Sequence, residues 1–376
     1  PDGVLYGFDD QNHPLIFDPF HPSLENANSV VFAKSGAGKS YFTKLTALRL
    51  LYTGIDFLVV DPEDEYRRLC QQVEGQYIRL ASSSGQHLNP FDLPPADAGQ
   101  EEGRDPLGEQ VAALIALVEV MIAEPGKPLS VGERAVLDTA LYETYASAGI
   151  ISDPTTHSAQ PPLLSDFHAV LAKTPGEVAA NLAARLRRYV SGSLAGLFGG
   201  PTNVELGNRF VVFNIQALEP ELRPVAIHLI AGFVWNRVRR SRRPRLLIID
   251  EAWALMQYPE GAAFLASMAR RARKYFLGLQ VITQDVADFL GSDHGRTVLA
   301  NAAIKVLMQQ DESTIEPVAN AFRLSDRERQ VLLTAAKGSG LFFVKGGHLG
   351  IHVEASPREH SFITTAPREL AAQEAA

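Results

Sequence analysis

The sequence has almost no cysteine and no long apolar run. Cys70 is the only cysteine among 376 residues, which excludes an internal disulfide and a zinc site built on cysteines. The longest apolar candidate, Val111–Ala123, contains Glu119 and is shorter than the ~20 residues that cross a bilayer, so it is typical of a buried helix. The ten histidines show no HExxH or other ligand spacing, and we expect no structural metal site.

An excess of positive charge and a targeting segment are also missing. The 35 Lys and Arg residues against 43 Asp and Glu residues give a net charge of -8, which argues against a surface that binds nucleic acid everywhere. Arginines are nevertheless clustered in residues 237–245 and 270–274, so a local channel for DNA stays open as an alternative to solvated helix ends. The first residues, PDGVLYGFDD, include no Met and no signal-peptide pattern, and we expect a processed chain or a piece of a longer protein.

Short apolar runs recur along the chain and predict strands. Several lack polar alternation, which is typical of strands buried on both faces of a mainly parallel sheet. Helical patterns such as Tyr41–Tyr52, closed by Gly54, separate many of them. The pattern predicts an α/β fold with a sheet between layers of helices, preceded by a hairpin at Val4–Phe17. The predicted strands are Ser29–Phe32, Phe57–Val60, Tyr77–Leu80, Phe210–Phe213, Leu246–Ile249, Leu279–Ile282, Ile304–Leu307 and Leu341–Val344.

The strand pattern stops between about Asp92 and Gly200. We interpret this region as an all-helical subdomain inserted into the α/β core; the alternative is that part of it belongs to the core layers. Its helical segments are Glu109–Ile122, Val131–Ala148, Ser165–Ala172 and Gly176–Ser191. The predicted division is 1–91 for the hairpin and the first part of the core, 92–200 for the insertion, 201–355 for the second part of the core and 356–376 for a C-terminal tail that docks as a helix or frays.

The clearest functional motif is AKSGAGKS, residues 33–40. It follows a predicted strand and opens a predicted helix, the context that a phosphate-binding loop requires, although Ala33 replaces the usual first glycine. Backbone N–H groups of such a loop converge on an anion. Lys39 would reach the β- and γ-phosphates of ATP, and the Ser40 hydroxyl would ligate Mg²⁺. The candidate nucleotide-binding residues are Ser35, Gly36, Ala37, Gly38, Lys39, Ser40 and Tyr41. The alternative is a glycine-rich turn without a ligand.

Two carboxylates and an amide follow other predicted strands. Asp250 and Glu251 come at the strand edge where open α/β sheets bind ligands. Asp250 would hold the Mg²⁺ shell, and Glu251 would accept a proton from the attacking water, unless the pair is only an acidic strand end. Gln284 ends the next strand and could sense the γ-phosphate, orient water or face solvent. Asp61 could join this site, but a cap for the following helix is favoured.

Together these residues resemble the motor domain of the VirB-four/TraC-type ATPases of type IV secretion and conjugation, in the HerA–FtsK superfamily of P-loop ATPases. The resemblance covers nearly the whole chain. Besides the GKS sequence of the phosphate loop, it rests on Asn26–Asn28, Asp61–Pro62, Glu65–Tyr66, Leu88–Phe91, Asp250–Trp253, Arg270–Lys274, Thr283–Gln284 and Ala355–Glu359.

The resemblance implies a RecA-like ATPase that forms a ring, as a hexamer, at the cytoplasmic face of the bacterial inner membrane. There it would energise pilus assembly and substrate transfer together with other secretion-channel components. It also implies that Arg273, with Arg270 as second candidate, serves as an arginine finger for a neighbouring subunit; the competing interpretation is a surface helix end. The resemblance also implies an additional N-terminal domain in family members, which supports the expectation that this chain is a piece of a longer protein.

Two other functions compete with this one. The first is a HerA- or FtsK-like DNA translocase or a coupling-protein DNA pump, for which DNA would be a partner. The second is a P-loop kinase or switch, which Glu251 and Gln284 disfavour because they suit the activation of water.

Overall fold

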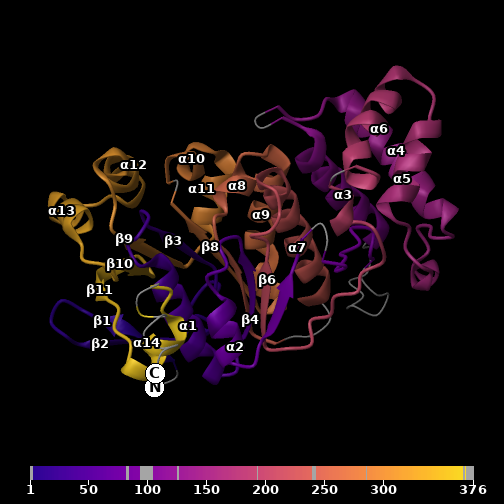
Figure 1. Cartoon of the computed structure of the whole chain (residues 1–376). Helices are drawn as coiled ribbons and strands as arrows, with labels where there is room; N and C mark the ends of the chain where they lie inside the picture. Colours follow the sequence, from indigo (N-terminus) through magenta and orange to yellow (C-terminus); the bar gives the residue numbers. More distant parts are fainter. Residues whose placement is uncertain are drawn as a thin grey trace.

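The computed structural model describes residues 3–81, 84–93, 105–124, 127–192, 194–238, 243–284, 286–366 and 369. Figure 1 shows a layered α/β body with a lobe of helices at one end. The strands are β1 (Val4–Phe8), β2 (Pro14–Phe17), β3 (Ser29–Phe32), β4 (Asp56–Asp61), β5 (Gln76–Arg79), β6 (Phe210–Asn214), β7 (Arg245–Ile249), β8 (Leu277–Thr283), β9 (Ile304–Met308), β10 (Ser339–Val344) and β11 (Gly347–His352).

The helices are distributed between and after these strands. In chain order they are α1 (Lys39–Tyr52), α2 (Arg67–Gln72), α3 (Pro106–Ile122), α4 (Val131–Ser147), α5 (Leu164–Lys173), α6 (Glu177–Val190), α7 (Arg223–Val238), α8 (Trp253–Met256), α9 (Pro259–Arg271), α10 (Val286–Gly291), α11 (Asp293–Ala300), α12 (Glu312–Phe322), α13 (Asp326–Thr334) and α14 (Pro357–Ile363). No helix in the described ranges is long and apolar enough to cross a membrane.

One sheet joins all the described strands, in the order β2-β1-β11-β10-β9-β3-β8-β7-β4-β6-β5. Neighbours from β9 to β5 pair in parallel. From β9 outward, β10, β11, β1 and β2 add antiparallel pairs. The predicted mainly parallel sheet is therefore confirmed.

Helices cover both faces of the sheet because successive residues of a strand point to opposite sides. In β3, Val31 packs in the apolar cluster that contains Phe42 and Leu45 of α1. Its neighbour Val30 packs in the other cluster, which contains Ile230 of α7. The sheet is thus the middle of three layers, as predicted.

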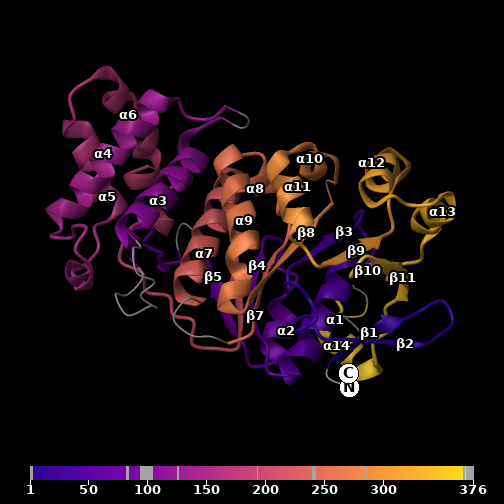
Figure 2. The ribbon, with the colours of Figure 1, turned by 180° about the vertical axis from the view of Figure 1, so that it is seen from behind.

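The helices α3–α6 form the lobe beside α7 and α9 in Figures 1 and 2. Helix α3 packs on α7 and α9 as well as on α4, so the lobe shares its core with the sheet layer. Glu119 of α3 is fully buried and pairs at 2.7 Å with Arg134 of α4, which also contacts Glu260 of α9. This burial confirms the helix predicted for the apolar run, whereas the four-part division of the chain stays a prediction.

Most predicted elements are present with ends shifted by one to a few residues. The hairpin is the pair β1–β2, and the start of the tail folds as α14, which packs on α1 and α2. Strand β11 was not predicted; it follows β10 through a turn at Lys345 and Gly346 with φ of 51° and 75°. Two positive φ values are typical of a tight hairpin turn, so the Lys345-Gly346-Gly347 sequence was an available signal.

Candidate functional site

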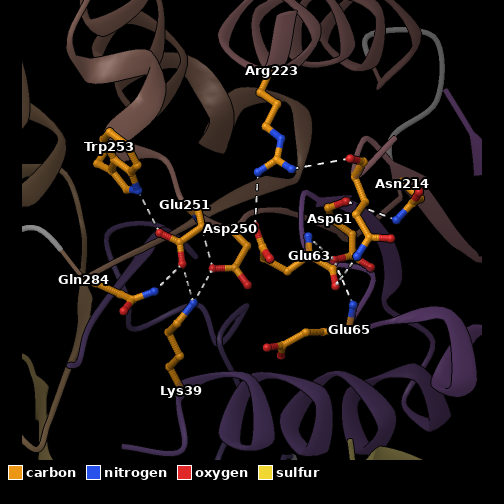
Figure 3. Close-up of polar contacts among 11 residues, drawn as sticks. Lys39, Asp61, Glu63, Glu65, Asn214, Arg223, Asp250, Glu251, Trp253 and Gln284 are labelled. Atoms are coloured by element: carbon orange, nitrogen blue, oxygen red, sulfur yellow. Dashed lines mark hydrogen bonds and ion pairs between the residues drawn. The ribbon is translucent and has the colours of Figure 1, made fainter. Parts of the chain in front are cut away.

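Three adjacent strand ends bring the predicted polar residues together. Strand β8 pairs in parallel with β3 on one side and with β7 on the other. The phosphate loop follows β3, Gln284 follows β8, and Asp250 with Glu251 follows β7. Because parallel strands end at the same edge of a sheet, these side chains meet there, as Figure 3 shows.

The loop ahead of α1 has the backbone of an anion-binding turn. Gly36 and Gly38 have φ of 78° and 100°, in the left-handed region that glycine adopts without strain. A Cβ at Gly38 would lie 2.9 Å from the backbone nitrogen of Gly338, and that nitrogen donates a 2.9 Å hydrogen bond to the Ala37 carbonyl. Ala33 is not among the residues with positive φ, so its methyl group is compatible with the loop.

The Lys39 side chain lies between the two carboxylates that follow β7. Its Nζ donates to Oδ1 of Asp250 at 3.0 Å and to Oε1 of Glu251 at 2.8 Å. The Lys39 and Asp250 side chains are only 10% and 2% exposed. The phosphate-loop cation and the acidic pair therefore form one buried cluster, which residue positions 211 apart in the sequence do not disclose.

Glu251 is the most connected member of this cluster. In addition to Lys39, it accepts hydrogen bonds from Gln284 Nε2 at 2.5 Å and from the indole N–H of Trp253 at 2.8 Å. Its backbone has φ of 52°, a costly conformation for a residue other than glycine that is found at functional sites. The turn directs the Glu251 carboxylate toward Lys39 and Gln284, as Figure 3 shows.

Lys39 and Glu251 favour each other's charged form, whereas burial works against the ionised form of Asp250. Burial alone would lower the pKa of Lys39, but the carboxylates of Asp250 and Glu251 outweigh it and raise that pKa above its ordinary value. Burial raises the pKa of Asp250 to about 6, although Lys39 opposes the shift. Burial also acts to raise the pKa of Glu251, yet Lys39, Gln284 and Trp253 bring it below its ordinary value. All three groups are thus charged at neutral pH.

Asp61 organises the loop beside this cluster rather than the helix end itself. Its carboxylate accepts the backbone N–H groups of Glu63 at 3.3 Å, Glu65 at 3.1 Å and Tyr66 at 2.9 Å. The N-cap position of α2 is held by Tyr66, whose side chain makes no capping hydrogen bond, so the favoured interpretation of Asp61 as the helix cap is wrong: Asp61 accepts N–H groups of the preceding loop and of Tyr66 instead. Burial raises the pKa of Asp61 to about 6 against the pull of those N–H groups.

A cavity of about 940 Å³ opens over the cluster, a size typical of small-molecule sites. One end is lined by charged residues, among them Glu63, Glu65, Arg223 and Glu251. Glu65 holds one buried oxygen, Oε2, without a hydrogen-bond partner in the described residues. Ser40 and Tyr41 line the cavity as well, so the predicted nucleotide-binding loop faces a space that admits a ligand.

The predicted arginine fingers lie at the opposite edge of the sheet. Arg270 lies in the last turn of α9, and Arg273 lies in the short 3-10 helix Ala272–Tyr275 that leads into β8. Both side chains are exposed. Strand β8 has seven residues, which at about 3.3 Å each separate its ends by roughly 23 Å. Neither arginine can therefore touch the Lys39 cluster of its own chain.

The other arginine cluster is only partly described. Arg245 begins β7 and lies 3.9 Å from Asp56, at the edge away from the cavity. Residues 239–242 and the side chain of residue 237 lie outside the described residues.

Three functional candidates were missed by the sequence analysis. Trp253 was noted only as part of a family motif, although it contacts Glu251. Gly338 and His360 line the cavity from segments about 300 residues after the phosphate loop. No local pattern indicates such long-range contacts.

The comparisons with known proteins agree with this architecture. The model of the family "TraG P-loop domain" matches residues 11–341. Protein TraC of Escherichia coli strain K12 is 24% identical over 319 residues, which are 80% of this chain and 34% of TraC. Type IV secretion system protein PtlC of Bordetella pertussis is 22% identical over 366 residues, covering 90% of this chain and 41% of PtlC. The chain thus spans less than half the length of these curated relatives.

Solved structures share the fold. The structure of VirB4 of Thermoanaerobacter pseudethanolicus is 30% identical, has a TM-score of 0.86, and matches 95% of this chain and 97% of that one. The plasmid coupling protein TrwB in complex with ADP and Mg²⁺ is 14% identical, with a TM-score of 0.57 over 88% of this chain and 86% of that one. The second likeness concerns the fold alone.

Proposed function

The chain belongs to the TraG P-loop domain family, and on that premise we propose that it is the ATP-hydrolysing motor part of a type IV secretion or conjugation machine. The relative PtlC is by name a type IV secretion system protein, and VirB4 shares the fold over nearly the whole chain. In this proposal the motor energises pilus assembly and substrate transfer, peripheral to the inner membrane and in contact with other channel components.

The phosphates of ATP would bind at the start of α1. The N–H groups of the loop from Ser35 to Tyr41 and the positive end of the helix favour an anion there. Lys39 would move one or more of its hydrogen bonds from the carboxylates to the β- and γ-phosphates, since its ammonium group has three donors.

The donor set fits a magnesium ion. Ser40 supplies a hydroxyl and Asp250 a carboxylate, the hard oxygen ligands that Mg²⁺ prefers. Both hydrogen bonds that Asp250 accepts within the described residues end on Oδ1. TrwB, with the same fold, has been solved with ADP and Mg²⁺. When bound, the ion would neutralise charge on the phosphate oxygens.

Glu251 would be the general base for the attacking water. Its lowered pKa keeps it ionised at neutral pH, so it can accept a proton. Gln284 and Trp253 donate to it from two elements and would fix the direction of its free lone pairs. Gln284 would also report the γ-phosphate to β8, because its amide would reorient when phosphate competes for the same donors.

The active site would be completed by a neighbouring subunit in a ring. Arg273 and Arg270 are exposed at the edge of the sheet away from their own Lys39. A guanidinium there can help only the γ-phosphate of another subunit, where it would spread positive charge over the transition state. We take this ring to be a hexamer.

The observation that carries the proposal is the contact of Lys39 with both Asp250 and Glu251. The test is the ATPase rate of the purified chain, measured against protein concentration with and without DNA. We expect a rate per subunit that rises with concentration and does not respond to DNA. Strong stimulation by DNA would favour the alternative, a HerA/FtsK-like translocase or coupling-protein DNA pump, and the absence of any hydrolysis at high concentration would contradict the proposal.

A further inference from the structure

The cavity over the phosphate loop has a second end that the proposed hydrolysis does not use. This end, the C-terminal wall, consists of Val353, His360, Ile363, Thr364 and Thr365. We propose that the C-terminal wall is the subsite for the base of the bound nucleotide, with the imidazole ring of His360 as its stacking platform. The inference rests on the proposed function, since it requires that the phosphate loop binds a nucleotide.

The wall begins directly beside the phosphate loop. Tyr41 follows Ser40 in the sequence, and its hydroxyl lies 3.0 Å from Nδ1 of His360. The two rings are 5.7 Å apart between centroids. Helix α14, which carries His360, lies next to α1 in Figures 1 and 2. A nucleotide anchored by its phosphates at Ser40 would therefore meet this wall with its far end.

The chemistry of the two ends of the cavity decides which one receives the base. The other end presents the charged side chains of Glu63, Glu65, Lys44 and Arg223, with Ile227 and Trp253 also lining the cavity, and charged groups lose hydration against an aromatic ring. The C-terminal wall presents aliphatic carbons, hydroxyl groups and an imidazole; of its charged neighbours Lys337 and Glu369, the second is engaged by His360 and Thr364. Nucleotide bases bind to flat rings and apolar surfaces of this kind.

The His360 ring is held in one orientation by hydrogen bonds at both nitrogens. Nδ1 contacts Tyr41, and Nε2 lies 2.9 Å from Oε2 of Glu369. The side chain nevertheless stays 41% exposed, so the ring can offer a face to a ligand while its edge is engaged. Thr364 also gives its hydroxyl to Glu369. Stacking, rather than hydrogen bonds from these side chains to the edge of the base, would hold the ligand.

Other contacts fix the wall on the core before any ligand arrives. Arg49 of α1 pairs with Glu359 at 2.7 Å and donates to the Leu5 carbonyl at 2.6 Å. Arg68 donates to the Ser361 carbonyl at 2.8 Å. A preformed wall loses little conformational freedom on binding, which favours affinity.

The test uses two kinds of probe, measured by isothermal titration calorimetry with Mg²⁺ present. ATP and GTP carry a base, whereas inorganic tripolyphosphate carries none. Base stacking is worth about 1–3 kcal/mol by alanine substitution, so we expect His360→Ala to weaken ATP binding by about 5- to 150-fold. Tripolyphosphate binding should stay at the wild-type value. GTP should bind wild type nearly as well as ATP, because stacking does not distinguish the two purines.

Two further variants separate the outcomes. His360→Phe keeps a flat ring and should restore most of the ATP affinity, and His21→Ala, in an exposed loop, should change nothing. Unchanged ATP affinity in His360→Ala would overturn the inference, as would equal losses for ATP and tripolyphosphate, which would mean that His360 only supports α1. If wild type bound neither ATP nor tripolyphosphate, the proposed function itself would fail. A strong preference for ATP over GTP would contradict recognition by stacking alone.

Discussion

The Nζ atom of Lys39 lies 2.8 Å from Oε1 of Glu251, so the cation of the phosphate loop and the predicted general base share a direct contact. Each group stabilises the charged form of the other. A γ-phosphate that draws Lys39 away would leave Glu251 with its two remaining donors, Gln284 and Trp253. Phosphate binding and the basicity of Glu251 are therefore coupled, because loss of a cation raises the pKa of a carboxylate.

Lys39→Ala should remove the charge-assisted hydrogen bonds to the phosphates. Such bonds contribute about 1.5–3 kcal/mol, so ATP affinity should fall roughly 10- to 150-fold. Fluorescence titration with a labelled nucleotide measures it. Lys34→Ala is the matched control, since Lys34 lies in the same loop but pairs with Asp311 at the surface. Equal affinities for wild type and Lys39→Ala would contradict the site assignment.

Asp250 and Asp61 give the site an expected pH dependence. Burial raises the pKa of each to about 6, and protonated Asp250 cannot hold the magnesium shell. We expect kcat/KM to fall as pH drops through about 6, since this profile reports groups of the free enzyme. A profile that is flat between pH 7 and pH 5 would exclude Asp250 from metal binding.

The same two carboxyls give the free energy of unfolding a pH dependence opposite to that of kcat/KM. The ordinary pKa of an aspartate is 3.8 and the folded pKa of each of these two is about 6, so between these limits the folded protein binds protons that the unfolded chain has released. Their contribution to the free energy of unfolding therefore decreases as pH rises from about 4 to about 6. Urea unfolding of wild type and Asp61→Asn across this pH range measures the contribution of Asp61 to the free energy of unfolding. If that free energy changed with pH equally in both proteins, the assigned role of Asp61 would be contradicted.

Mixed rings test whether Arg273 acts on a neighbour. Arg273→Ala should bind ATP normally but hydrolyse it slowly at every concentration, since arginine fingers contribute ~10³–10⁵ in turnover. Lys39→Ala should be inactive for a different reason, because its loop has lost the cation that holds the phosphates. In a mixture of the two, some interfaces combine an intact loop with an intact finger, and activity should return.

The mixture needs an exchange control. Subunit exchange can be followed by energy transfer between differently labelled variants. No recovery in samples that demonstrably exchange, or full hydrolysis by dilute monomers, would contradict action in trans. Recovery with Arg270→Ala but not with Arg273→Ala would assign the finger to Arg270.

Local patterns predicted the sheet and the phosphate loop because each depends on residues close in sequence. Val30 and its neighbours form a buried strand through their own side chains, and Gly38 permits the turn that starts α1. The order of strands then placed Asp250 and Gln284 at the same edge. Family resemblance added Trp253 as a motif residue, but not its hydrogen bond to Glu251.

Local patterns do not predict contacts between distant segments. Position 38 requires glycine because of its positive φ and also because Gly338 approaches it closely. No pattern near residue 38 indicates this approach. His360 lies in the tail, for which the sequence predicts either a docked helix or a frayed end, and its helix is held on α1 by the Arg49–Glu359 ion pair among other contacts. Such contacts arise from packing of the finished fold.

The most direct test of the account is Glu251→Gln, with nucleotide affinity and turnover measured on the same sample. Glutamine keeps the shape of the side chain but cannot accept the proton, and removing a general base typically costs ~10²–10⁴ in rate. ATP–Mg²⁺ affinity should stay close to wild type, and turnover should be lower by that range. Wild-type turnover, or parallel loss of affinity and turnover, would contradict the assignment of Glu251 as the base of an ATP-hydrolysing motor.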